Sequence, residues 1–81
     1  MNVKEATAKR IVELCKERTI AYNRLANQCG ITPSTIYSIF DSKKGHKTIT
    51  ISTIKKICDG LDISLKQFFD SPMFENLDDE D

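Results

Sequence analysis

The chain has 81 residues, of which 40% are hydrophobic and 30% are charged, and its 12 basic and 12 acidic residues give a formal net charge of zero. This composition indicates one small soluble domain, because a second hydrophobic core would need a longer chain. No run approaches the ~18 apolar residues that span a bilayer, and the start lacks the apolar core of a secretion signal, so we expect a cytoplasmic protein with no membrane contact.

The charges are unevenly distributed along the chain. Residues 1–69 carry all 12 basic residues and six of the 12 acidic ones, a net charge of +6, whereas residues 70–81 carry the other six acidic residues, a net charge of −6. A basic body with an acidic end is typical of chains whose partner is a polyanion. We therefore expect a folded domain at residues 1–70 and an acidic, flexible tail at residues 71–81.

The first helix is predicted for residues 2–17. Its apolar side chains recur at helical spacing on one face, and the charged side chains fill the rest, which is most simply a solvated surface. The inward set is Thr7, Ile11, Leu14 and Cys15, and the charged set includes Lys4, Glu5, Lys9, Arg10 and Glu13.

A second, short helix is predicted to end at Gly30. A glycine after the last periodic residue adopts the left-handed conformation at little cost, and Ile31 behind it can pack back onto the helix. The inward set is Ala21, Leu25, Ala26 and Cys29.

The third helix is predicted for residues 33–40. It follows Gly30 at once, because Thr32 is a favourable N-cap and proline is preferred at the first helical position. Its inward set is Ile36, Ile39 and Phe40, and its outward set is Ser34, Tyr37 and Ser38, with Pro33 and Thr35 in the first turn. Two short helices joined by a glycine turn are typical of a helix-turn-helix, and the outer face is narrow and uncharged enough for a DNA major groove.

The polar connection at residues 41–47 is the most basic stretch of the sequence. Lys43, Lys44 and Lys47 follow the third helix closely, where phosphates would flank a groove, so we expect them to contact the DNA backbone. The alternative is a merely soluble loop.

Two further helices are predicted after this connection. Thr50 can cap the fourth, which is expected to end near Gly60, and Ser64 can cap the fifth. Their inward sets are Ile51, Ile54, Ile57, Cys58 and Leu61 for the fourth helix and Leu65, Phe68 and Phe69 for the fifth. Lys55 and Lys56 either extend the positive surface or are simply solvated.

Pro72 is expected to end the helical pattern, and two interpretations remain open for the residues that follow. The first is disorder, because so few apolar residues cannot offset the entropy of ordering. In the second, Phe74 and Leu77 anchor the tail on the body or on a second subunit while its acidic residues imitate phosphates.

Neither a metal site nor an enzyme is indicated by the polar residues. Cys15, Cys29 and Cys58 match no familiar ligand spacing and lie on apolar helix faces, so we interpret them as buried thiols and expect no cofactor. With one histidine and no clustered carboxylates in the predicted domain, no acid, base or nucleophile has an orienting partner. We expect a protein that is not an enzyme and that has no small-molecule substrate.

The sequence from residue 24 to residue 39, RLANQCGITPSTIYSI, resembles the phage repressor and Cro-like regulators of the XRE family. The Leu-Ala pair, the Gly-Ile-Thr turn and the Ser-Thr-Ile positions carry the resemblance, and the segment LDISL at residues 61–65 extends it, so that it covers residues 11–69. Two departures are Tyr22, where relatives commonly have glutamine, and Phe40 with Ser42, where many have glutamate and then glycine.

The resemblance implies a five-helix, lambda-repressor-like domain that binds double-stranded DNA and regulates transcription, as a repressor on an operator. It places base-reading side chains at Pro33, Ser34, Tyr37 and Ser38. The expected backbone contacts are Tyr22, Thr32, Thr35, Lys43, Lys44 and Lys47. Because a single domain of this size buries a limited DNA surface, we also expect a homodimer on half-sites about one helical turn apart, ~34 Å. The fifth helix with Phe68, Phe69 and the tail is the expected dimer surface, because apolar residues near a terminus have the least core to cover them.

The alternative to a DNA-binding regulator is a helical protein-interaction module, such as an adaptor or a toxin-neutralising partner. Such a module would expose apolar residues on the outer face of the third helix. That face offers Ser34, Thr35 and Ser38, which favours groove contact, while Tyr37 fits either function.

Overall fold

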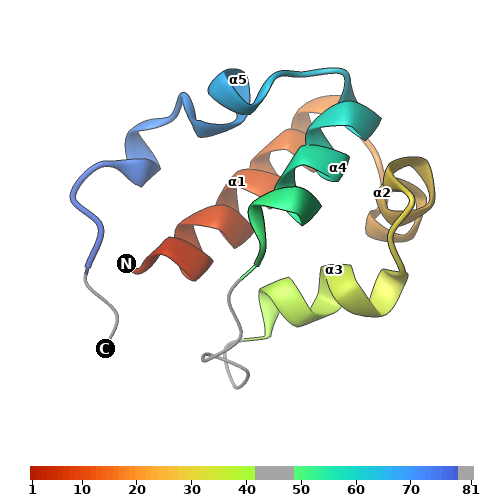
Figure 1. The fold of residues 1–81 in the computed structure, drawn as a ribbon, viewed down its shortest axis with the longest axis horizontal. Helices are drawn as coiled ribbons and strands as arrows, with labels where there is room; N and C mark the ends of the chain where they lie inside the picture. The colour runs from red at the N-terminus through yellow and green to blue at the C-terminus, as the bar shows by residue number, and fades with distance from the viewer. Residues whose placement is uncertain (42–48, 79–81) are drawn as a thin grey trace.

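The computed structural model describes residues 1–41 and 49–78, and in these ranges the chain forms five α-helices and one turn of 3-10 helix, with no strand (Figure 1). The elements are α1 (Val3–Arg18), α2 (Tyr22–Cys29), α3 (Pro33–Phe40), α4 (Ile51–Leu61), α5 (Leu65–Phe69) and η2 (Pro72–Phe74). The all-α fold class predicted from the sequence is confirmed. Residues 42–48, which include Lys43, Lys44 and Lys47, lie outside the described residues.

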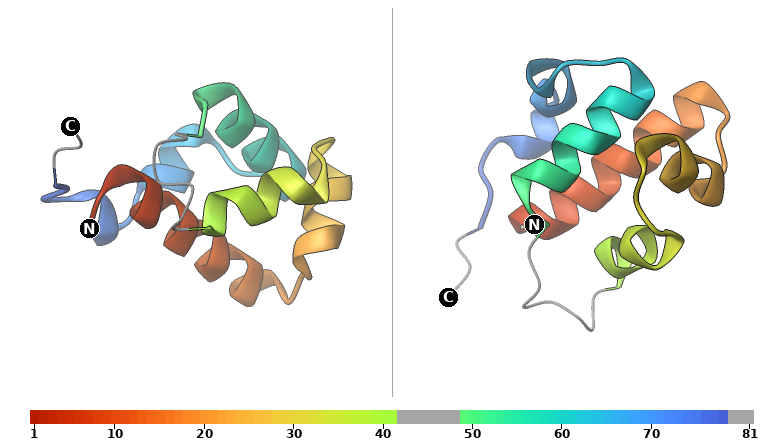
Figure 2. Two further views of the ribbon diagram at one scale, coloured as in Figure 1. Left: turned by 90° about the horizontal axis from the view of Figure 1, so that it is seen from below. Right: turned by 45° about the vertical axis from the view of Figure 1, so that its right-hand side comes forward.

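The helices are arranged so that α2 and α3 occupy one side of the molecule. Helix α2 packs against α4, and α3 contacts both α1 and α2 (Figures 1 and 2). Helix α5 and the η2 turn lie at the opposite side, where they pack against α4 and α1 respectively. The helix-turn-helix is therefore supported by α1 and α4 and lies on the other side of the molecule from α5 and η2.

All five α-helices contribute side chains to one hydrophobic core. The largest fully buried apolar side chains are Ile11, Leu25, Ile36, Ile57 and Phe68. Full burial of such a side chain contributes about 1.5–3 kcal/mol. Packing of the inward faces of α2, α3 and α4 in this core thus determines the position of the helix-turn-helix.

Side chains cap the N-termini of four of the five α-helices in the described part of the chain. Asn2 and Ser64 form reciprocal capping boxes with Glu5 and Gln67, and the hydroxyls of Thr32 and Thr50 accept hydrogen bonds from the amides of Thr35 and Thr53. The caps predicted at Thr32, Thr50 and Ser64 are confirmed. Helix α2 is the exception, because its N-cap is Ala21.

Three helices end in the same way, with a left-handed residue followed by an isoleucine. Thr19, Gly30 and Asp62 have φ values of 52°, 70° and 57° after α1, α2 and α4. The next amide in each case, that of Ile20, Ile31 or Ile63, donates to the carbonyl oxygen five residues back at 3.0–3.1 Å. This is the Schellman arrangement, and all three isoleucines pack against the core. The turn predicted at Gly30 and Ile31 is therefore correct, and the structure adds two more.

Several single-residue expectations were wrong. Ala21 was predicted to face inward, but it is the exposed N-cap of α2, one residue before the helix begins. Ile51 was placed in the core, yet it is 59% exposed because it is the first residue of α4. Helix α4 does end near Gly60 as expected, at Leu61, and it uses Asp62 as its left-handed cap.

Arg10 was predicted to lie on a solvated face, but its guanidinium group holds the end of α5. Nε donates to the carbonyl oxygen of Phe68 at 2.6 Å and Nη2 to that of Gln67 at 2.8 Å, while Glu13 pairs with the same side chain. A cation at a helix C-terminus satisfies carbonyl groups that have no partner within the helix.

The end of the chain folds back onto the body as far as the structure describes it. Pro72 begins the η2 turn, where the sequence suggested that helical structure would stop; proline is compatible with a first helical position. The Phe74 ring packs against Phe68 and Phe69, with centroids 6.1 and 4.9 Å apart. Asp78 forms an ion pair with the N-terminus, because its carboxylate lies 3.0 Å from the amino group of Met1. Phe74 therefore acts as the body anchor that the second interpretation of the tail required.

Candidate nucleic-acid interface

Helices α2 and α3 meet through the short turn at residues 30–32. The buried residues of α2 are Leu25, Ala26 and Cys29, and those of α3 are Ile36 and Ile39, so both helices turn their apolar faces to the core. Their outer faces are polar, and neither helix contains an acidic residue. The surface formed by α2, the turn and α3 is therefore free of the negative charge that would repel a phosphate backbone.

The start of α3 is held by a small cluster of hydroxyl groups. Thr32 Oγ1 lies 3.0 Å from Ser34 Oγ and 2.9 Å from Thr35 Oγ1, and it accepts the amide of Thr35 at 3.3 Å. Pro33 and Ser34 are exposed in the first turn. Thr32 and Thr35, both expected to contact the DNA backbone, thus bond to each other, and Thr32 also serves as the N-cap.

Tyr37 and Ser38 lie one turn further along α3. Tyr37 is 50% exposed, whereas Ser38 is half-buried. Together with Pro33 and Ser34, these are the four side chains expected to contact bases, and the structure brings them onto a single helix of eight residues. An α-helix with its side chains is about 10–12 Å in diameter, which suits the ~12 Å width of a major groove.

Tyr22 does not extend freely from α2. Its ring packs on Phe40, with centroids 4.9 Å apart, and stands perpendicular to the Tyr37 ring at 6.4 Å. The three rings link α2 to both turns of α3. Phe40, predicted as a core residue, is half-buried and packs against the core cluster.

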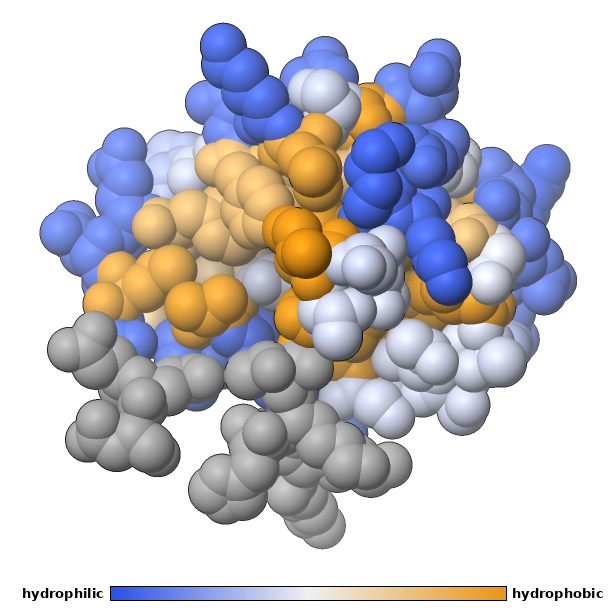
Figure 3. All heavy atoms as spheres, viewed as in Figure 1, coloured by the Kyte–Doolittle hydropathy of each residue, from blue (hydrophilic) through white to orange (hydrophobic). Residues whose placement is uncertain are grey.

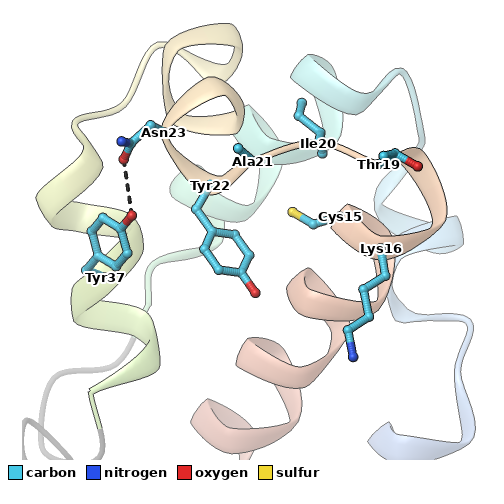
Figure 4. A pocket seen from close by; sticks show the side chains of 8 residues that line it. All are labelled: Cys15, Lys16, Thr19, Ile20, Ala21, Tyr22, Asn23 and Tyr37. Carbon is cyan, nitrogen blue, oxygen red and sulfur yellow. Dashed lines mark hydrogen bonds between the residues drawn. The ribbon is translucent and has the colours of Figure 1, made fainter.

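Asn23 is a polar residue of this surface that the sequence analysis did not single out. Its Oδ1 accepts a hydrogen bond from the hydroxyl of Tyr37 at 3.2 Å (Figure 4). The bond joins the second residue of α2 to the outer face of α3. No periodicity marks this pair, since the two residues are 14 apart and meet only because the two helices fold against each other.

The N-terminus of α2 differs from those of the other helices because Ala21 has no side-chain group to cap it. The amides of Tyr22, Asn23 and Arg24 precede the first intrahelical bond, which Leu25 donates to Ala21 at 2.9 Å. Such amides and the positive end of the helix dipole favour an anion. Exposed Arg24 adds a positive charge in the same turn.

An open hollow of about 590 Å³ lies between the end of α1, the start of α2 and the side of α3 (Figure 4). It is lined by Cys15, Lys16, Thr19, Ile20, Ala21, Tyr22, Asn23 and Tyr37. The Tyr22 hydroxyl points into it, and Lys16 is its charged residue. The hollow is therefore continuous with the surface that carries the α2 N-terminus and Tyr37.

Lys4 fixes the point where the chain leaves α3. The side chain was expected on a solvated face, but it is only 7% exposed and its Nζ donates to the carbonyl oxygen of Asp41 at 2.9 Å. Asp41 is the first residue of the basic connection, whose three lysines were expected to contact phosphates and lie outside the described residues. Lys4 thus determines where that connection starts.

The three cysteines are buried free thiols, as predicted. Burial raises the pKa of Cys15 and Cys58, and it raises the pKa of Cys29 to about 11, with the neighbouring Cys15, Cys58 and Asp59 adding to the shift. Among the described residues no group of three or more histidine, cysteine or acidic side chains is placed to hold a metal ion. No helix in those ranges is long and apolar enough to cross a membrane.

Two short helices that meet at a left-handed glycine, with a polar, acid-free outer face on the second, define a helix-turn-helix domain. The chain belongs to the Cro/C1-type helix-turn-helix DNA-binding domain family, whose profile matches residues 10–72. It is similar to the crystal structure of the prophage Lp1 protein 11, with a TM-score of 0.79 and 34% identity over 89% of this chain and 93% of that chain. No curated protein matches the sequence. The family predicted from residues 11–69 is thus confirmed, and the protein is a DNA-binding domain of the regulator type.

Proposed function

We propose that the domain is a sequence-specific transcriptional repressor that places α3 in the major groove of duplex DNA and blocks transcription by occupying its operator. The observation that supports this most directly is the outer face of α3, where Pro33, Ser34, Tyr37 and Ser38 present groups that can bond or pack on base edges with no charge among them. Each good contact contributes up to about 1–3 kcal/mol of discrimination.

The backbone contacts of the proposal lie around this face. The uncapped α2 N-terminus and Arg24 suit a phosphate on one side of the groove, with the Tyr22 hydroxyl beside them. Thr32 and Thr35 lie at the start of α3, and Lys43, Lys44 and Lys47 would bind phosphates at the other end of the helix. Loss of one lysine should weaken binding to all sequences about equally.

A second copy of the chain completes the proposal, because one domain of this size covers a single half-site. The surface we propose for the homodimer is formed by α5 and η2, where apolar side chains gather (Figure 3). Leu65, Phe69 and Phe74 are half-buried there. Phe68, which we expected to share in this contact, is fully buried and cannot reach a partner.

The test is a fluorescence-anisotropy titration of random duplex DNA at 50 and 200 mM salt, comparing the wild type with the Lys43→Ala, Lys44→Ala, Lys47→Ala triple variant. Counterion release predicts wild-type binding that falls steeply with salt and a slope up to about three units shallower in the variant. A Lys55→Ala, Lys56→Ala variant on α4, titrated in parallel, shows whether those two lysines extend the positive surface. Absence of salt-sensitive binding at 50 mM would contradict the proposal and favour a protein partner.

In vitro selection from a random duplex library tests the finer claims. A repressor dimer should enrich inverted repeats with half-sites about 34 Å apart along the duplex. Enrichment of a single, unpaired site would contradict the dimer while leaving DNA recognition by α3 intact.

A further inference from the structure

The hydrogen bond between Tyr37 and Asn23 limits what the Tyr37 hydroxyl can recognise. A phenol has one proton, and that of Tyr37 is directed at Asn23 Oδ1, so the oxygen retains only lone pairs for another partner. We infer, on the basis of the proposed function, that Tyr37 accepts a hydrogen bond from the exocyclic amino group of adenine or cytosine in the major groove, and that Asn23 is the positioning residue that sets this preference.

The Tyr37 side chain is held in place before DNA arrives. The Tyr22 ring stands edge-on to it at 6.4 Å, and Tyr22 itself packs on Phe40 at 4.9 Å and on the core. Tyr37 nevertheless remains 50% exposed, so the side chain that carries the bond to Asn23 still faces solvent (Figure 4). A side chain fixed on two sides loses little conformational entropy on binding, and its bonding direction is preserved.

The direction of the Tyr37 bond discriminates among the groups that DNA presents. Adenine N6 and cytosine N4 are donors in the major groove, whereas guanine O6 and N7 and thymine O4 are acceptors, as are all phosphate oxygens. A hydroxyl oxygen that has already donated its proton is attracted to the amino groups of adenine and cytosine. It is repelled by the acceptor atoms of guanine, thymine and phosphate. Tyr37 thus contributes to base discrimination and not to phosphate binding.

The serines of α3 have no such restriction. The hydroxyl pair of Thr32 and Ser34 can be bonded in either direction, and a serine hydroxyl rotates to donate or to accept. Ser34 and Ser38 therefore tolerate either polarity of base edge. Tyr37 is distinctive because the amide oxygen of Asn23 determines which way its hydroxyl points.

Asn23 retains its own donors after it has accepted the Tyr37 proton. The Nδ2 group carries two N–H donors, and the residue is exposed in the first turn of α2, next to the uncapped amides. A phosphate bound there would accept from Nδ2. Asn23 Oδ1 would then affect the base preference of Tyr37, and Asn23 Nδ2 would affect the affinity for every DNA sequence.

The experiment is a selection from a random duplex library with four full-length proteins: wild type, Tyr37→Phe, Asn23→Ala and Asn23→Asp. The wild type should enrich adenine or cytosine at one position of each half-site, and Tyr37→Phe and Asn23→Ala should lose that preference. Asn23→Asp should keep it, because a carboxylate also accepts the Tyr37 proton, while binding all sequences more weakly because the phosphate donors are gone.

A second readout identifies the amino group directly. In the selected site, adenine is replaced by purine, or cytosine by 2-pyrimidinone, each of which lacks the exocyclic amine. The wild type should lose affinity by about two- to tenfold, the value of one neutral hydrogen bond, and Tyr37→Phe should be indifferent. Both altered side chains are exposed, and far-UV circular dichroism verifies that each variant is folded.

The outcomes separate this inference from the proposed function. Selection of guanine or thymine at the Tyr37-dependent position would overturn the inference alone, as would an unchanged preference in Asn23→Ala. A wild-type protein that enriches no sequence and shows no salt-sensitive duplex binding would overturn the proposed function, and the inference with it.

Discussion

Thr19 holds a backbone conformation that is costly for a branched side chain. Its φ of 52° and ψ of 50° are left-handed, which costs an ordinary residue about 1–2 kcal/mol, and its side chain is exposed. Thr19→Gly should therefore raise the free energy of unfolding by about 0.5–1 kcal/mol, after allowing for the greater freedom of glycine in the unfolded chain. Urea denaturation measures this difference.

The same physical reason predicts the opposite result at Gly30, which serves as a control for Thr19. A Cβ added at Gly30 would meet nothing within 4 Å, so Gly30→Ala tests backbone strain alone and should cost about 1 kcal/mol. Asp62→Gly should raise the free energy of unfolding by less than Thr19→Gly does, because a short polar side chain tolerates the left-handed region better. A Thr19→Gly variant no more stable than the wild type would show that the strain is relieved elsewhere.

At the scale of single residues, the sequence predicts local bonds well and distant bonds poorly. Thr32, Thr50 and Ser64 were recognised as caps because each bonds an amide three residues away, at a spacing that the sequence displays. Lys4 and Arg10 were assigned to solvent because their carbonyl partners lie 37 and 58 residues away. A long cationic side chain gives no local sign of the carbonyl it will reach. The Asn23 and Tyr37 pair was missed for the same reason.

Helices α2 and α4 approach each other closely at Gly60. A Cβ at this position would lie 2.4 Å from Cys29 Sγ and 3.1 Å from Cys29 Cα. Gly60→Ala gains about 1 kcal/mol of helix propensity, but the added Cβ overlaps Cys29 Sγ and lies tightly against Cys29 Cα, so α2 must shift and the cost is larger. We expect a net loss of about 1–2 kcal/mol in the free energy of unfolding, measured by urea denaturation.

A double-mutant cycle identifies the clash as the cause. Cys29→Ala removes Sγ but leaves Cα and Cβ, so the Cys29→Ala, Gly60→Ala double variant should recover part of the loss, with a coupling of at least about 0.5 kcal/mol. Ser52→Ala, at an exposed position of α4, is the matched control and should not destabilise the helix. Additive effects at Gly60 and Cys29 would exclude the contact as the cause.

At the scale of elements, periodicity identified all five α-helices because each has an apolar face that must be buried. Gly60 was interpreted only as a sign that the helix end is near, and its second role, which is to let α2 approach, was missed. A glycine inside a helix has two such explanations, and only the position of the neighbouring helix decides between them. Since α2 is the first helix of the helix-turn-helix, this close contact also fixes the base of the proposed DNA-binding surface.

For the whole molecule, the fold class and the family followed from the pattern of residues 11–69, whereas the course of the tail did not. Composition favoured disorder at residues 73–81, but Phe74 meets an aromatic surface that Phe68 and Phe69 create only after folding. Likewise, Asp78 pairs with Met1 from the other end of the chain. The Met1 and Asp78 pair joins the two ends of the described chain, and the Phe74 contact depends on where α5 lies after folding, so no local pattern encodes either contact.

The buried thiols give the whole molecule a predictable sensitivity to alkali. Cys29 has a pKa of about 11 in the folded protein because of burial and its thiol neighbours, against an ordinary value of 9.0. Its protonated form is favoured by folding, so this contribution to stability is complete below pH 9 and is lost as the pH rises from about 9 towards 11. At pH 10.5 the loss should be about 2 kcal/mol from this group alone.

Urea denaturation under reducing conditions at pH 8 and pH 10.5 measures the effect, and Cys29→Ala isolates it from the lysines and tyrosines that titrate in the same range. The free energy of unfolding of the wild type should fall more than that of the variant, by about the contribution of one thiol. The pKa values of Cys15 and Cys58 are also raised by burial, so the variant should retain some alkaline sensitivity. Equal losses in the two proteins would show that Cys29 ionises as readily in the folded core as in the unfolded chain, which would contradict its burial between α2 and α4.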